Sequence, residues 1–224
     1  MIRKRGGIRM KLHKFLLLLM LGTGAAFICG AGPLFRPISF SSNEKAGMDE
    51  IKAQFFVDAD QSTAWKVLSD YERIPQFVSS MKKSHIEEVK DGDIYLCQEA
   101  EAGFLFITKR VHVLLRVHEV PGQSISFQDV SQKDFYFYQG SWNIDPGPQG
   151  GVTITYHLQA QKNFDAPFAG NYMNGGAKDL IIAVQKQIYQ QQVKIDKANS
   201  VSVMAGQNSV IHPMTPSVSH PTVN

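Results

Sequence analysis

Cysteine is scarce in this 224-residue chain, which contains only Cys29 and Cys97. One lies in the N-terminal segment and the other in an expected strand, so the pair does not predict a disulfide framework. The chain is long enough for one domain of roughly 150 residues with a tail at each end. A domain of that size buries a core that holds it together without disulfides, which excludes the small disulfide-bonded scaffolds.

The chain also lacks a hydrophobic run of membrane-spanning length. Its longest apolar stretch, from Phe15 to about Ile28, is shorter than the ~20 residues that a spanning helix needs. Residues 1–14 before it carry six basic side chains and no acidic one, and small residues follow it. A basic segment, an apolar segment and small residues in this order are typical of a secretory signal peptide.

We therefore predict that residues 1–35 are a signal peptide or, where they are not cleaved, an N-terminal membrane anchor. Cleavage after Ala26 and cleavage after Ala31 both fit, and Met10 is an alternative start to Met1. The cysteine in this segment would suggest a lipoprotein signal, but a bulky residue precedes it where such signals have a small one. The folded part is expected to be exported, periplasmic or secreted, or to be associated with a membrane through this segment.

The part of the chain that folds has no excess of basic charge. The whole chain has 23 Lys and Arg against 20 Asp and Glu. Residues 1–35 hold six of the basic residues and none of the acidic ones, so 17 basic residues remain against 20 acidic ones. A net charge near −3 without a basic stripe argues against a nucleic-acid partner.

Residues 196–224 form the other separable segment. From residue 198 onward the chain contains no charged side chain, three prolines and no helical or strand periodicity, which predicts a disordered tail. His212 and His220 lie too far apart in it to predict a metal site. The folded domain is thus expected over residues 48–195.

Sequence motifs for catalysis are absent as well. The chain has no nucleophile elbow, no glycine-rich phosphate loop and no paired metal-ligand motif, so we predict no cofactor, no metal and no catalytic residue. His112, His118 and His157 fall on the polar side of alternating strands, which predicts exposed side chains. Glu99 has two interpretations: a solvated carboxylate, or an acid with a raised pKa where its face of the strand is concave.

The sequence does contain a strand followed by two short helices. Residues 51–57 have the aromatic and β-branched bulk of a strand. Asp58 or Asp60 can cap the helix that follows. Pro75 then separates a second short helix, because proline lacks a backbone N–H yet fits the first turn of a helix. We expect this second helix to extend to Met81.

Residues 83–162 alternate between apolar and polar side chains, which predicts about six antiparallel strands. The alternation is clearest over residues 111–117 and 152–158. Asp91–Gly92 predicts a hairpin turn. Gly140, inside an aromatic strand, predicts a bulge or bend.

The last regular element is an amphipathic helix that we expect to begin after Gly175–Gly176. Its apolar stripe consists of Ala177, Leu180, Ile181, Val184, Ile188 and Ile195. The fold class is therefore α+β: a curved antiparallel sheet of about seven strands wrapped around a long C-terminal helix, with two short helices after the first strand. One helix covers a curved sheet only in part, and the hollow between them is the natural ligand site.

This order of elements resembles the SRPBCC, or START-type helix-grip, superfamily, and within it the polyketide cyclase/dehydrase and coenzyme Q-binding branch. Three stretches carry the resemblance: AWKVLSDYERIPQFVSSM (64–81), FYFYQGSWNIDPGPQGGVTITYHL (135–158) and NFDAPFAG (163–170). The resemblance implies a helix-grip fold but does not fix the ligand, because one fold hosts many functions. Members include lipid and quinone carriers and cyclases, many of them cytosolic or mitochondrial, so the expected secretory segment is a departure.

Ten residues are expected to line the hydrophobic cavity. They are Val113, Leu115, Phe127, Tyr138, Trp142, Ile154, Tyr156, Met173, Ile181 and Val184. Three of them, Tyr138, Trp142 and Tyr156, and also Tyr136 could line the pocket and stack on a quinone or sterol-like ring. Each could also be core, since in this fold the core and the cavity wall are one surface.

The expected function is non-catalytic binding or transport of a hydrophobic small molecule: a lipid, a fatty acid or an isoprenoid quinone. A polyketide-type cyclase or dehydratase that uses an acid or a tyrosine in the pocket is the alternative. A third hypothesis is a module that binds another protein through the outer face of the sheet. An inward-pointing carboxylate or histidine would favour the second, and a fully packed interior the third.

Overall fold

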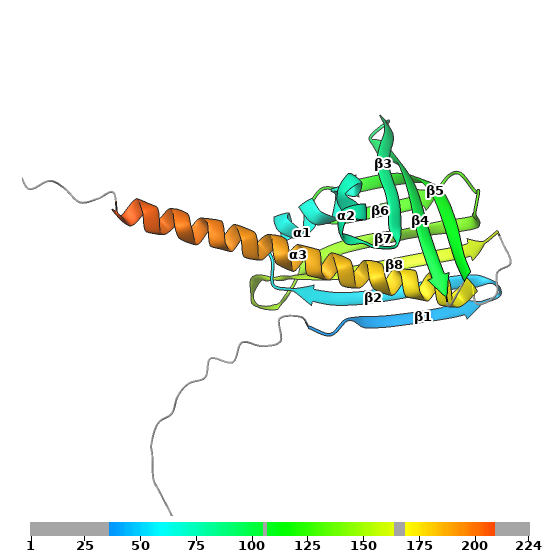
Figure 1. The fold of residues 1–224 in the computed structure, drawn as a ribbon, viewed down its shortest axis with the longest axis horizontal. Coiled ribbons are helices and arrows are strands. Elements are labelled where there is room, and N and C mark those ends of the chain that lie inside the picture. Colours follow the sequence, from blue (N-terminus) through cyan, green and yellow to red (C-terminus); the bar gives the residue numbers. More distant parts are fainter. Residues whose placement is uncertain (1–35, 105–106, 164–168, 209–224) are drawn as a thin grey trace, which may run out of the picture. The chain divides into compact units, whose positions relative to one another are not determined.

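The computed structural model describes residues 36–104, 107–163 and 169–208 (Figure 1). The strands are β1 (Ser39–Lys45), β2 (Met48–Val57), β3 (Met81–Lys90), β4 (Asp93–Phe104), β5 (Ile107–Val120), β6 (Ser124–Asp129), β7 (Phe135–Pro146) and β8 (Val152–Lys162). The helices are α1 (Gln61–Leu68), η1 (Tyr71–Arg73), α2 (Ile74–Phe77), η2 (Pro148–Gly150) and α3 (Ala169–Asn208). The expected signal segment, residues 1–35, lies outside the described residues, as do residues 209–224.

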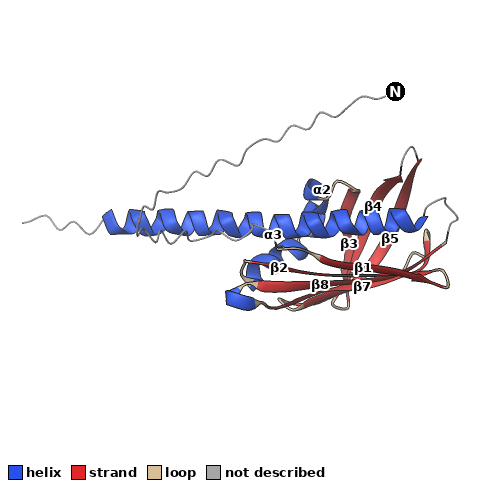
Figure 2. Ribbon diagram, turned by 90° about the horizontal axis from the view of Figure 1, so that it is seen from below, coloured by secondary structure: helices blue, strands red, loops and turns tan. Residues whose placement is uncertain are grey.

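The described strands form one antiparallel sheet of eight, in the order β1-β2-β8-β7-β6-β5-β4-β3. The sheet curves around α3, which crosses one of its faces (Figures 1 and 2). This confirms the predicted α+β class and the sheet wrapped around a long C-terminal helix. The strand beyond the expected seven is β1, whose sequence SFSSNEK is mostly polar and exposed and therefore shows no apolar alternation.

Alternating side chains bury one face of the sheet against α3, and we call this the inner face. Ile51 on β2 and Ile154 on β8 are both 0% exposed. Ile181 and Ile188 on α3 are 0% exposed as well. The predicted alternation of residues 152–158 and the apolar stripe of the last helix are thus confirmed.

Two short helices, α1 and α2, follow β2 as predicted. Asp60 precedes α1 but makes no side-chain cap, and its backbone carbonyl accepts the first hydrogen bonds instead. Pro75 lies in the first turn of α2, where no N–H is needed. The prediction that this helix extends to Met81 is wrong. It ends at Phe77, because Val78 takes extended backbone angles (φ −106°, ψ 104°) that lead into β3.

Gly140 does not mark a bulge, contrary to the prediction. It pairs in register with Phe127 of β6, and the irregularity in β7 lies between Phe135 and Phe137. A Cβ at Gly140 would lie 2.5 Å from the Phe127 ring and 2.4 Å from the carbonyl oxygen of His157. Glycine is needed here because the Phe127 ring lies directly against the neighbouring strand.

The helix α3 is longer than predicted at both ends. It begins at Ala169 rather than after Gly176, and it continues to Asn208. The predicted tail is therefore wrong for residues 196–208. Extending an existing helix needs no new nucleation, so this stretch is helical although it lacks an apolar stripe. Within the described ranges, no helix is both long and apolar enough to cross a membrane.

Two buried glutamines fix the middle of α3 to the rest of the fold. Gln185 donates hydrogen bonds to the carbonyl oxygens of Arg36 at 3.1 Å and Phe56 at 3.4 Å. Gln192 accepts one from the Asp60 N–H at 3.0 Å and donates one to the Asp60 carboxylate at 3.3 Å. These bonds connect α3 to the segment before β1, to the end of β2 and to the start of α1.

Candidate functional site

Two cavities lie between α3 and the inner face of the sheet. The larger, of about 130 Å³, is bordered by β4, β5, β7, β8 and the first half of α3. The smaller, of about 90 Å³, is bordered by the sheet, α3 and the short helices α1, η1 and α2. Met81, Gln98, Tyr138, Tyr156 and Leu180 border both. The two cavities are therefore adjoining compartments of one interior site.

Eight of the ten predicted ligand residues border these compartments. Val113, Tyr138, Tyr156 and Met173 border the larger one, and Leu115, Phe127, Tyr138, Trp142, Tyr156 and Val184 border the smaller one. Ile154 and Ile181 border neither, and both are 0% exposed. Ile154 pairs with Phe55 and Ile144 on the neighbouring strands, where the sheet is packed core. Ligand contact by the other eight stays a prediction.

Sequence reasoning missed the part of the wall that comes from β4 and from the segment after α2. Val78, Met81, Gln98 and Ala100 border the site. Gln98 points inward because alternate residues of a strand face opposite sides, and it is only 9% exposed. Leu96 and Ala100, two positions before and after it, were the available signal, since both are small or apolar on the same side of the strand.

Tyr138 and Tyr156 are the main polar feature of the interior. Their side chains lie close enough to affect each other's pKa. Burial raises the pKa of Tyr138 to about 12, although the interaction with Tyr156 acts in the opposite direction. Burial also raises the pKa of Tyr156 well above its ordinary value. Both phenols therefore keep their protons near neutral pH and can donate hydrogen bonds.

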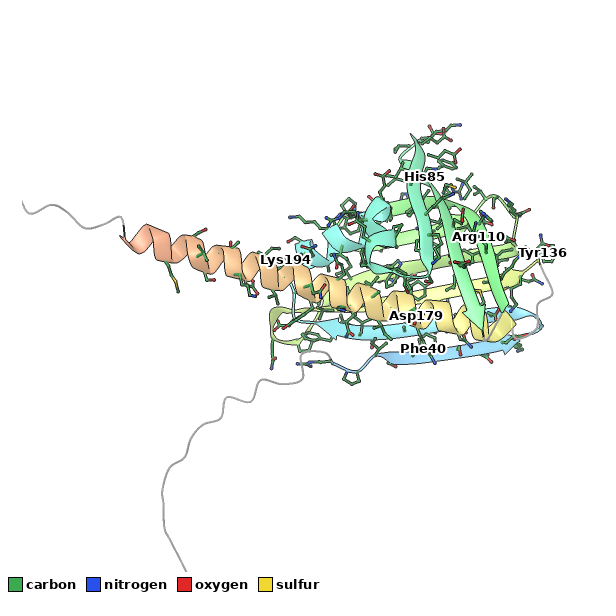
Figure 3. All side chains as sticks on the ribbon, in the orientation of Figure 1. Phe40, His85, Arg110, Tyr136, Asp179 and Lys194 are labelled. Atoms are coloured by element: carbon green, nitrogen blue, oxygen red, sulfur yellow. The ribbon has the colours of Figure 1, made fainter. Side chains whose placement is uncertain are left out.

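The surrounding aromatic rings hold these two tyrosines in place. The Tyr156 ring centroid lies 4.4 Å from that of Trp142, and the Tyr138 centroid lies 4.7 Å from that of Phe135. Tyr136, the further aromatic candidate, is 62% exposed and lies at the margin of the sheet (Figure 3). The prediction that Tyr136 could line the pocket is wrong.

Glu99 lies on the outer face of β4, so its interpretation as an acid with a raised pKa is wrong. Burial alone would raise the pKa of its carboxyl group, but a hydrogen bond from Lys83 and the charges of Lys83, Arg110 and His112 outweigh burial and lower it. The Lys83 Nζ is 3.3 Å and the Arg110 Nε is 3.2 Å from its oxygens. Glu99 is a carboxylate in an outer ion-pair network.

The histidines also belong to the outer face. His112, His118 and His157 have side chains that are 39%, 64% and 35% exposed. Each is beside at least one carboxylate, and these partners are Glu99, Asp134, Asp93 and Glu50. In the part of the chain that the structure describes, no cluster of His, Cys, Asp or Glu could hold a metal ion.

The described wall of the interior site carries little charge. Its one carboxylate among the described residues is Glu101, which is 32% exposed and paired with Lys82 at 3.4 Å. None of the described wall residues is a histidine, lysine or arginine. The arrangement can enclose an apolar molecule and offer it a few hydrogen bonds.

A larger hollow of about 520 Å³ lies on the outer face of β5 to β8. Its wall is polar, and its side chains bond to one another, as Gln139 does to Gln159 at 3.3 Å and His118 does to Asp93 at 2.9 Å. Because this hollow is polar and open to solvent, and several of its side chains already bond to one another, it is a weaker candidate than the interior. We therefore place the site between α3 and the sheet.

Solved structures with the same fold come from several bacteria. They include a STAR-related lipid transfer protein from Xanthomonas axonopodis (16% identity, 66% of this chain and 98% of that chain, TM-score 0.51) and a START superfamily protein from Mycobacterium smegmatis (15% identity, 65% and 98%, TM-score 0.51). The aromatase/cyclase Zhui from a Streptomyces species is similar too (12% identity, 66% and 94%, TM-score 0.54). No curated protein matches the chain in sequence.

At these identities the solved structures show the fold, a START-like helix-grip. A family model adds a match at the level of sequence. The model, described as polyketide cyclase / dehydrase and lipid transport, matches residues 57–184, more than half of the chain. This chain therefore belongs to the polyketide cyclase/dehydrase and lipid transport family.

Proposed function

We propose that this chain binds or transports a hydrophobic small molecule, without covalent chemistry, in the two compartments between α3 and the sheet. The class of ligand is a lipid, a fatty acid or an isoprenoid quinone. The observation that carries the proposal is the wall itself: apolar side chains from β3, β4, β5, β7 and β8 and from α3 surround the larger compartment on several sides. Burying an apolar tail there supplies roughly 25 cal/mol per Å² before the costs of binding.

The size of the compartments indicates that the site widens when it is occupied. Ligand pockets for drug-sized molecules hold about 300–1,000 Å³, whereas these hold about 130 Å³ and 90 Å³. Gly175 and Gly176 lie in the part of α3 that covers the larger compartment, and a Cβ on either would meet no atom within 4 Å. This loosely packed stretch of helix is where room for a ligand is most easily made.

The alternative function is a cyclase or dehydratase. Tyr138 favours it to a limited extent, because a neutral phenol inside the cavity could donate a proton. Such an enzyme also needs a group that accepts a proton. The described wall supplies only Glu101, which is paired with Lys82 and partly exposed. We therefore favour binding over catalysis.

We also propose that the chain is exported, with residues 1–35 as a signal peptide or a membrane anchor. The support is the order of basic, apolar and small residues in that segment. Cell fractionation followed by N-terminal sequencing of the product tests it. A product that keeps its first residue and stays in the cytoplasm would contradict export.

Native mass spectrometry tests the binding function. The full chain is expressed, purified as the host processes it and transferred to buffer without detergent, and any adduct is extracted and identified. We expect a discrete adduct of lipid or quinone mass that is weakened by Val184→Phe, which fills the smaller compartment, and retained by Val193→Phe. Val193 is also on α3 but borders neither compartment. An adduct-free mass after incubation with a cell-envelope lipid extract would overturn the proposal.

A further inference from the structure

The polar side chains of the interior meet at the junction of the two compartments. Gln98, Tyr138 and Tyr156 border both compartments, and they reach it from β4, β7 and β8. The walls on either side of this junction are mainly apolar, with Ser80 and Glu101 in the larger compartment and Tyr71 in the smaller one as the other polar side chains. Only one segment of a ligand that fills both compartments would therefore contact these three polar side chains of the junction.

The hydrogen bonds already made at this junction leave donors and an acceptor for a ligand. Gln98 Nε2 donates one N–H to Ser84 Oγ at 3.1 Å, so its second N–H can still donate and the Gln98 carbonyl oxygen can still accept. Tyr138 and Tyr156 meet at the same junction. Even where one of the two hydroxyls donates to the other, the second O–H is left to donate to a ligand. An alcohol can satisfy a donor and the acceptor, and a ketone or ester carbonyl can accept from the tyrosine.

A negatively charged head would find no such match. None of the described side chains that border the site is cationic, and Glu101 at its edge is anionic. Two lysines near the site are already paired: Lys82 with Glu101 and, on the inner face of β8, Lys162 with the buried Asp49. Neither lysine borders a compartment. Burying a carboxylate without a partner costs far more than burying a neutral oxygen that is hydrogen-bonded.

We infer that the ligand of this site is an uncharged amphiphile: an apolar body with a neutral oxygen function, such as an alcohol, ketone or ester carbonyl, rather than a fatty-acid anion. This inference rests on the proposed function and narrows it. It selects neutral lipids and quinones from the wider class, and Gln98 and Tyr138 on the sheet are the residues that recognise the oxygen.

Oleyl alcohol and oleate test the inference, because they share a hydrocarbon chain and differ in the charge of the head. Both are titrated into the full chain at pH 8, where oleate is ionised, with intrinsic tryptophan fluorescence of the Trp65→Phe background as the readout, so that the signal comes from Trp142 in the site wall. We expect the alcohol to bind about tenfold tighter or more. Gln98→Leu and Tyr138→Phe should each weaken the alcohol by about fivefold to tenfold and leave oleate unchanged. Gln98→Lys should shift the preference toward oleate.

The possible outcomes separate the inference from the function. Oleate that binds as tightly as the alcohol would overturn the inference while the binding function stands. Oleate binding that is lost in Lys162→Met would overturn it too, since Lys162 would then leave Asp49 to hold the anion. Binding of neither compound, nor of any lipid from a cell-envelope extract, would overturn the function and the inference together. Near-UV circular dichroism shows which variants keep the native fold.

Discussion

Gly176→Leu should remove most ligand binding while it raises stability, and Gly175→Leu should raise stability alone. Both glycines lie in α3, and neither has an atom within 4 Å of the position that a Cβ would take. Gly176 borders the larger compartment, whereas Gly175 is exposed. The two substitutions thus make the same chemical change at adjacent positions of one helix, once beside the cavity and once in solvent.

The expected magnitudes follow from helix propensity and from the volume that is filled. Glycine in a helix interior is about 0.8–1.0 kcal/mol less favourable than the best helix formers, so each variant gains up to about 1 kcal/mol in free energy of unfolding. Leucine at position 176 also places about four apolar carbons where ligand atoms would lie, and at ~0.8 kcal/mol per buried CH₂ the ligand loses about 3 kcal/mol. That loss corresponds to roughly two orders of magnitude in Kd.

Thermal unfolding and a displacement titration with a neutral fluorescent lipid measure both quantities on the same samples. The reasoning is confirmed when the Tm rises in both variants and the affinity falls only in Gly176→Leu. Equal affinity in the wild type and both variants would refute the assignment of the ligand to this compartment. Equal loss in both would mean that helix stiffness, rather than cavity volume, controls binding.

Three further predictions concern stability. Tyr71→Phe removes a 2.5 Å hydrogen bond to the Glu119 carboxylate and should cost about 1–2 kcal/mol in urea unfolding; an unchanged midpoint would contradict it. Gly140→Ala places a methyl group 2.5 Å from the Phe127 ring and should cost about 1–3 kcal/mol, whereas a variant as stable as wild type would show that the strands can separate. Burial would raise the pKa of Asp134, but hydrogen bonds from a backbone N–H and a lysine lower it below its ordinary 3.8. Its stabilisation is therefore present above pH 3.8 and is lost as the pH falls through the lower folded pKa, so Asp134→Asn should flatten acid unfolding in that range.

The strands could be predicted wherever one face is buried and the other is solvated. Residues 152–158 alternate because β8 lies in the middle of the sheet, with α3 on one side and solvent on the other, and the prediction for them is confirmed. Strand β1 lies at the sheet edge and is exposed at nearly every position. Its sequence therefore has no apolar–polar alternation from which a strand could be predicted. The prediction of the C-terminal end of α3 is wrong for a related reason. Residues 196–208 are exposed wherever they are described, so they have no apolar stripe from which a helix could be predicted.

For the interior site, the sequence predicts which side chains point inward but not which of them border a cavity. Periodicity places Ile154, Tyr156 and Val184 on inward faces, but it does not say which of them meets a neighbour and which meets a cavity. Ile154 is covered fully, while Tyr156 and Val184 border open volume. Gln98 was missed because its polarity suggests solvent, although its position on β4 points inward. Such a residue is identified by the mismatch between its chemistry and its strand position, which is also what makes it informative about the ligand.

The contacts of α3 are distributed unevenly, and this decides how the site can accept a ligand. Gln185 and Gln192 connect the middle of the helix to the segment before β1, to β2 and to the start of α1 through four hydrogen bonds. The larger compartment lies under the earlier turns, beside Gly176. The sheet side of the compartment is fixed, because β4 pairs with β5, and β7 with β8, over almost their whole length. For the proposed ligand, room for the apolar body is then gained by movement of the first turns of α3, while Gln98 stays on the rigid sheet to recognise the oxygen. The sheet thus selects the polar oxygen function of the ligand, whereas the first turns of α3 determine which sizes of apolar body can be accommodated.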